Sequence, residues 1–276
     1  MDIKAADVAK LRAMTGAGMM DCKKALVEAE GDFERAKDII REKGKLVAAK
    51  RADRHATQGV VTSKIVGQKG YMLCLACETD FVAQNADFVA AAKSILDIAV
   101  EADAENLEAL LAVVKDGKTV AEIVTEKSGQ TGEKVELAYY GKIEAPMCVT
   151  YIHMNSKLGT LIGFNKDIDK EVAKDVAMQA AAMAPVSIDK TDCDPKVIEH
   201  ERMIGREQAR QEGKPEAMLD KIAEGKVNKF LNENTLLNQA LVKNNKITVG
   251  AYIKGAAKEA TVVAYQRFTL NDKLVN

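Results

Sequence analysis

Tryptophan is absent from this chain of 276 residues, and aromatic residues as a whole make up only 4%. Proteins that hold single-stranded nucleic acid stack bases on aromatic side chains, so there is little here from which to build such a platform. The chain also has no excess of one charge, because 40 Lys and Arg residues are balanced by 41 Asp and Glu residues. A protein with this balance has no net electrostatic field that would attract nucleic acid or an anionic membrane. We therefore expect no direct binding of nucleic acid.

Long apolar runs and a regular cysteine pattern are missing too. No run approaches the roughly 18 residues that a membrane span needs. The first residues, MDIKAADVAKLRAMTG, carry charges throughout instead of the apolar core of a signal peptide. The five cysteines, at positions 22, 74, 77, 148 and 193, are odd in number and irregularly spaced, which is typical of a reducing compartment. We expect a cytoplasmic protein that does not associate with a membrane.

Sequence motifs of common enzymes are lacking as well. There is no GxxxxGK[ST] phosphate-binding loop, no GxSxG nucleophile elbow and no HExxH zinc motif. Cys74 and Cys77 form a single CxxC pair, and the three histidines are scattered, so four convergent zinc ligands are not supplied. Residues three apart on a strand point to opposite faces, which favours two core cysteines. We expect a binding protein rather than an enzyme, with no catalytic residue, no cofactor and no metal.

What the sequence does contain is the composition of a globular protein, with 47% hydrophobic and 29% charged residues. Residues 1–45 show three short helical patterns, which predict a three-helix domain. Gly31 and Asp32 suit the end of the second helix and the beginning of the third. Residues 46–56 are charged and predict a linker, with a helix as an alternative form.

Two related patterns of strands followed by helices fill the rest of the chain. We interpret residues 57–133 as one core subdomain, in which a hairpin turn at residues 67–70 leads into a continuous apolar strand over residues 71–77. After this strand, residues 103–128 are predicted to be helical. Residues 134–276 form the second subdomain and repeat the order of strands and helix, which suggests a degenerate internal duplication.

The second subdomain contains an insertion at residues 192–231. Two helical segments there are joined by Glu212-Gly-Lys-Pro215, which predicts an antiparallel helical hairpin. The fold class predicted from these patterns is α+β.

Two short segments are candidate interaction sites. Met19 and Met20 begin the second helix, and a small core cannot hold both side chains. One interpretation is that one of them is exposed on an adaptable surface for a partner, the other is that they simply fill gaps in the packing, and composition gives these two interpretations equal weight. The second segment follows the buried strand and consists of Thr79, Asp80, Phe81 and Val82. It forms a turn that the rigid strand supports, and functional residues often lie on such turns. Asp80 can cap the next helix. From spacing alone, we expect Phe81 to pack in the core rather than project as a wedge.

The same two segments resemble the signatures of the elongation factor Ts family. TGAGMMDCKKAL, at residues 15–26, is similar to the family's opening signature, and ETDFVA, at residues 78–83, is similar to its core signature. The order of parts also fits, and the resemblance covers essentially the whole chain. It implies an N-terminal module similar to a ubiquitin-associated domain, two related core subdomains with antiparallel sheets, and an inserted coiled-coil hairpin.

The resemblance also implies a function, namely guanine nucleotide exchange on elongation factor Tu during protein synthesis. The N-terminal module would dock on the nucleotide-binding domain of that partner, in its GDP-bound and nucleotide-free states, and the second core half would contact another domain. Asp80 and Phe81 would intrude near the partner's Mg²⁺, flanked by Thr79 and Val82, and loosen the GDP phosphates. The docking residues implied by the resemblance are Arg12, Met19, Met20, Thr131, Gly132 and His153.

Two features differ from some members of the family. The last strand is expected over residues 260–270, and residues 271–276 follow it, whereas certain relatives carry a further C-terminal helix that contacts the partner. The loop at residues 128–132 contains two glycines that the family pattern does not lead us to expect.

Three alternatives stay open beside the exchange factor. The first is a non-catalytic adaptor that binds proteins through the three-helix bundle. The second is an RNA-binding protein that uses the basic run of Lys43, Lys45, Lys50, Arg51 and Arg54, for which a solvated linker is the favoured interpretation. The third is a redox enzyme that uses Cys74 and Cys77. A dimer or a heterotetramer, through the core or the hairpin, is also left open, with weak self-association expected for the free protein.

Overall fold

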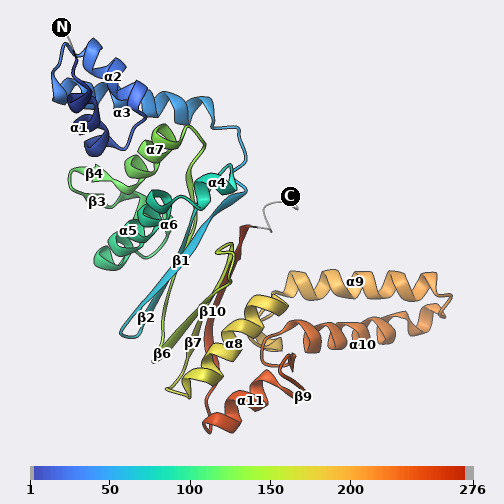
Figure 1. Cartoon of the computed structure of the whole chain (residues 1–276). Helices are drawn as coiled ribbons and strands as arrows, with labels where there is room; N and C mark the ends of the chain where they lie inside the picture. Colours follow the sequence, from blue (N-terminus) through green and yellow to red (C-terminus); the bar gives the residue numbers. More distant parts are fainter. Residues whose placement is uncertain (1–2, 271–276) are drawn as a thin grey trace.

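The computed structural model describes residues 3–270 and confirms the α+β class (Figure 1). A small helical module stands at one end, two antiparallel sheets with covering helices form the centre, and a long helical hairpin projects from the far half. The difference from relatives at residues 271–276 lies outside the described residues. No helix within residues 3–270 is long and apolar enough to cross a membrane.

The N-terminal module consists of α1 (Ala5–Thr15), α2 (Met19–Glu28) and α3 (Phe33–Lys50). Asp32 begins α3 as expected, because its carboxylate accepts hydrogen bonds from the N–H groups of Glu34 and Arg35. α3 continues to Lys50, so residues 46–50 of the expected linker are helical. The three helices bury a small core of Val8, Leu11, Ala17, Cys22, Ala25, Leu26, Ala29 and Ala36.

The first sheet has the order β1-β2-β5, with antiparallel neighbours. Its central strand, β2, is buried on both faces, as its continuous apolar sequence predicts. The third strand follows the expected subdomain boundary between residues 133 and 134, yet it pairs with β2, so the first sheet extends across that boundary. The strands are β1 (Gln58–Val66), β2 (Lys69–Cys77) and β5 (Glu136–Glu144), and the helices on the outer face are α5 (Ala86–Ala102), α6 (Leu107–Ala112) and α7 (Val120–Thr131).

The second sheet repeats this topology with the order β10-β7-β6. In both sheets, a hairpin is followed by helices and then by a third strand beside the second one. The inner faces of the two sheets pack on each other through residues such as Met72, Cys74 and Leu161. The elements are β6 (Met147–Ile152), β7 (Leu158–Phe164) and β10 (Val262–Thr269), covered on the outer face by α8 (Lys170–Met183) and α11 (Val249–Ala256).

One predicted helix is wrong in part. Between α6 and α7 lies a tight hairpin of β3 (Val114–Lys115) and β4 (Lys118–Thr119). Asp116 and Gly117 form its turn with φ values of 52° and 79°. An Asp-Gly pair favours this two-residue turn because both central residues need positive φ, and the turn interrupts the helical pattern.

The inserted hairpin consists of α9 (Pro195–Gln211) and α10 (Glu216–Asn234). Ala209, Leu219 and Ala223 are buried where the two arms pack together. Ion pairs such as Arg206–Asp220, at 3.2 Å, join the arms on the solvent side. Short elements complete the fold: α4 (Asp80–Ala83), a 3₁₀ turn (Lys190–Asp192), β8 (Ala240–Leu241) and β9 (Asn244–Thr248).

Candidate functional site

The turn after β2 presents Phe81 to solvent. Thr79 begins α4, and its hydroxyl accepts a hydrogen bond from the N–H of Val82. Within this single turn of helix, Ala83 is buried and Val82 packs against the core, so Phe81 points the other way and is 85% exposed. The expectation that Phe81 packs in the core is therefore wrong. The phenylalanine that belongs to the same core cluster as Ala83 is Phe88, which is 2% exposed.

A carboxylate from a distant part of the chain holds this turn. Glu133 accepts hydrogen bonds from the N–H groups of Glu78 and Thr79, at 3.1 and 3.0 Å, and from the Thr79 hydroxyl at 2.6 Å. Hydrogen bonds to an ionised acceptor are stronger than neutral ones. Sequence reasoning missed Glu133, because a partner 54 positions away leaves no spacing signal.

Glu78 ties the same turn to the end of α3. Arg51 donates to both carboxylate oxygens at 2.9 Å, and the N–H of Lys134 donates to one of them at 2.6 Å. Burial raises the pKa of Glu78, but these hydrogen bonds and the charges of Arg51 and Arg54 outweigh it and bring the pKa below its ordinary value. The carboxylate is thus ionised and fixed between the helical module and the core.

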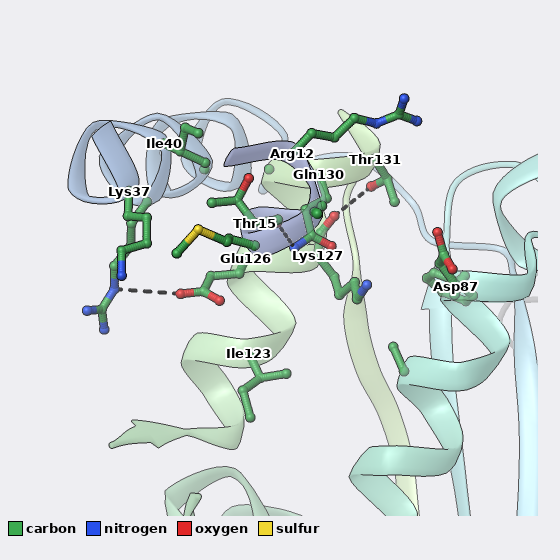
Figure 2. Close-up of a pocket in the computed structure, with 18 of the residues that line it drawn as sticks. Arg12, Thr15, Lys37, Ile40, Asp87, Ile123, Glu126, Lys127, Gln130 and Thr131 are labelled. Atoms are coloured by element: carbon green, nitrogen blue, oxygen red, sulfur yellow. Dashed lines mark hydrogen bonds and ion pairs between the residues drawn. The ribbon is translucent and has the colours of Figure 1, made fainter. Parts of the chain in front are cut away.

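A cleft of about 1460 Å³ lies at the junction of the N-terminal module and the helices of the first core sheet (Figure 2). It lies between α1 and α3 on one side and α5 and α7 on the other. Figure 2 shows Arg12 extending from the module toward the side where Thr131 ends α7. The structure brings five of the expected site residues to this one cleft: Arg12, Met19, Phe81, Val82 and Thr131.

The cleft carries apolar side chains and charges of both signs. Met19 and Phe81 are exposed on its walls, together with Met14 at 50% exposure. Burial lowers the pKa of Lys127, while the charges of Asp87 and Glu126 oppose that shift. Exposed apolar surface rimmed by mixed charges is typical of a protein-binding surface and does not favour a polyanion.

The remaining expected residues lie beside or away from the cleft. Asp80 is exposed next to Phe81, and Met20 is 64% exposed beside Met19. Gly132 ends α7 in the left-handed conformation, with φ of 72°. His153 lies between β6 and β7 in the second sheet, where its Nδ1 is 3.0 Å from the Tyr151 hydroxyl. The structure therefore does not bring His153 to the cleft.

Cys74 and Cys77 lie on opposite faces of β2. Cys77 belongs to the core under the helices, and Cys74 belongs to the core between the sheets. Burial raises the pKa of Cys77 to about 12, the opposite of an activated thiol. Residues 3–270 contain no group of three or more His, Cys, Asp or Glu side chains arranged to hold a metal ion.

Comparison with known proteins gives one consistent result. The sequence profile of the family described as "Elongation factor TS" matches residues 78–272. A protein of Porphyromonas gingivalis named elongation factor Ts is 47% identical over 272 residues, which cover 98% of this chain and 99% of that protein. A protein of Cytophaga hutchinsonii with the same name is 48% identical over 275 residues, again 98% and 99% of the two chains.

Proposed function

The chain belongs to the elongation factor Ts family of translation elongation factors, and we propose that it is a guanine nucleotide exchange factor for elongation factor Tu. The observation that carries this proposal is the position of Phe81. A phenylalanine that is 85% exposed stands on a braced turn, beside a cleft that Arg12 and Met19 also line. An apolar side chain held out in this way is suited to insertion into another protein.

In the proposed mechanism, the protein weakens the partner's hold on GDP without any covalent step. GDP is held in such GTPases through Mg²⁺ and through backbone amides on its phosphates. Phe81 supplies apolar area to a wedge, and Asp80 acts by charge or hydrogen bonding on the metal's surroundings. A wedge that binds the nucleotide-free partner better must lower the affinity for GDP by the same factor, because coupling between two ligands is reciprocal.

In this proposal, the N-terminal module and the second sheet contact different domains of the partner. The module at residues 1–45 docks on the nucleotide-binding domain of the partner through Arg12, Met19 and Met20. Thr131 and Gly132 contact the same domain from α7. His153, on the second sheet, contacts another domain of the same partner, which accounts for its distance from the cleft. We propose that this takes place in the cytoplasm, with no cofactor and no direct contact with nucleic acid.

The test is stopped-flow release of a fluorescent GDP analogue from elongation factor Tu, with and without this protein. We expect a large acceleration that weakens as the Mg²⁺ concentration rises. Formation of a stable complex with no acceleration would contradict the exchange function and would identify the protein as an adaptor that binds through its three-helix module.

A further inference from the structure

Helices α3 and α7 cross at Gly44 and Gly129 with their backbones in contact. A Cβ atom built on Gly129 would lie 2.4 Å from the Cα of Gly44, too close for any side chain. A Cβ atom on Gly44 would lie 3.5 Å from the Cα of Gly129, which is an ordinary contact. The crossing therefore requires glycine at residue 129 and tolerates alanine at residue 44.

Neither glycine is needed for its own backbone conformation. Both lie inside helices, and neither has a positive φ. Glycine is less favourable than alanine in a helix interior because it loses more conformational freedom on folding. The close approach of α3 and α7 explains why residue 129 is glycine. Gly129 is one of the two glycines at residues 128–132 that the family resemblance left unexplained.

Specific polar contacts on both sides fasten this crossing. Arg41 on α3 makes an ion pair with Glu122 on α7 at 2.6 Å. The side chain of Gln130 donates a hydrogen bond to the carbonyl of Thr15 at 2.6 Å, which satisfies a carbonyl at the end of α1 (Figure 2). These contacts fix the rotation of the module about α7 as well as its distance.

The crossing sets the geometry of the cleft. Arg12 and Met19 lie on the module side, and Phe81 lies on the core side. We propose that the Gly44–Gly129 crossing is a positioning device that holds the docking face of the module at the separation from Phe81 at which both engage the GTPase partner together. This inference rests on the proposed exchange function. Two contacts that bind simultaneously reinforce each other only while their spacing matches the partner.

The experiment compares three alanine substitutions at glycines in helices. Gly129→Ala must push the helices apart by about 1 Å at the crossing to restore ordinary contact distances. Gly44→Ala is the matched control at the same crossing, because its Cβ atom would meet the Cα of Gly129 only at an ordinary contact distance of 3.5 Å. Gly225→Ala, in α10, is the remote control, because a Cβ atom there has nothing within 4 Å. We expect Gly129→Ala to lower the apparent second-order rate constant of stimulated GDP release by about tenfold or more, with Gly44→Ala and Gly225→Ala within about twofold of wild type.

The distance between two labels on the free protein distinguishes a change in spacing from a general loss of stability, because a loss of stability alone would leave that distance unchanged. Spin labels at Lys24→Cys on α2 and Lys93→Cys on α5 report the spacing of module and core, while all five native cysteines are buried. We expect the label distance to shift in Gly129→Ala and to stay unchanged in Gly44→Ala. Gln130→Ala removes the hydrogen bond between Gln130 and Thr15 without adding volume at the crossing. It should broaden the distribution of label distances and slow GDP release to a corresponding extent.

The outcomes separate this inference from the proposed function. If wild-type protein does not accelerate GDP release, the proposed exchange function is wrong, and the positioning role, which depends on it, is wrong as well. If wild type accelerates release, the positioning role is overturned when Gly129→Ala matches wild type, when Gly44→Ala is equally damaged, or when release slows with no change in label distance.

Discussion

Thr79 and Glu133 are joined twice, because the backbone N–H and the hydroxyl of Thr79 both donate to the carboxylate of Glu133, at 3.0 and 2.6 Å. Thr79 immediately precedes the turn that exposes Phe81. The orientation of that turn is thereby linked to the end of α7, which is also the helix that supports the N-terminal module.

Replacing Glu133 with glutamine tests this link. The amide nitrogen of glutamine cannot accept a hydrogen bond, so at least one donor of Glu78 or Thr79 loses its acceptor. We expect Glu133→Gln to lower the free energy of unfolding by about 1–3 kcal/mol and to slow stimulated GDP release. Urea denaturation and stopped-flow release measure the two effects. Glu42→Gln, at an exposed position of α3, is the control and should change neither.

Removing the side chain of Phe81 tests the wedge. Because Phe81 is 85% exposed, Phe81→Ala should change the free energy of unfolding by less than about 0.5 kcal/mol. Stimulated GDP release should slow by about tenfold or more, since an aromatic hot spot contributes about 2 kcal/mol or more to binding. Met203→Ala, at a residue of α9 that is 63% exposed and lies outside the cleft, is the matched control. Equal release rates for wild type and Phe81→Ala would exclude the wedge.

The pKa of Glu78 predicts how stability depends on pH. A carboxylate whose pKa is lower in the folded state stabilises that state above its ordinary pKa of 4.5, and this stabilisation is lost as pH falls through the lowered value. Glu78→Gln should therefore be less stable than wild type near neutral pH, and the difference should shrink in acid below pH 4.5. Urea denaturation across that range measures the difference. A gap that stays constant with pH would show that Glu78 does not act through its charge.

The buried cysteines predict slow reaction with thiol reagents. Burial raises the pKa of Cys77 to about 12, so almost none of this thiol is ionised at neutral pH. All five cysteines lie within residues 3–270, are buried and form no disulfide bond. We expect native protein to react very little with an aromatic disulfide reagent, and unfolded protein to titrate all five thiols. Rapid reaction of one or two thiols in the native state would support the redox alternative.

The local elements of the fold could be predicted from the sequence because their signals are local. The Asp32 cap, the turn between β1 and β2, and the double-sided burial of β2 each depend on a few neighbouring residues. The turn at Asp116 and Gly117 had such a signal as well, but the surrounding helical pattern outweighed it. The two family signatures likewise pointed to the segments that carry Met19 and Phe81.

By itself, the sequence determined the α+β class, most of the longer helices and strands, and the membership of the family, since all of these follow from residue types along short stretches. Tertiary structure alone decided that Phe81 faces solvent, that Glu133 braces its turn, and that Gly129 meets Gly44. Each of these depends on segments that are far apart in the chain. Burial and close approach between such segments arise only when the helices and sheets pack, so no local pattern records them.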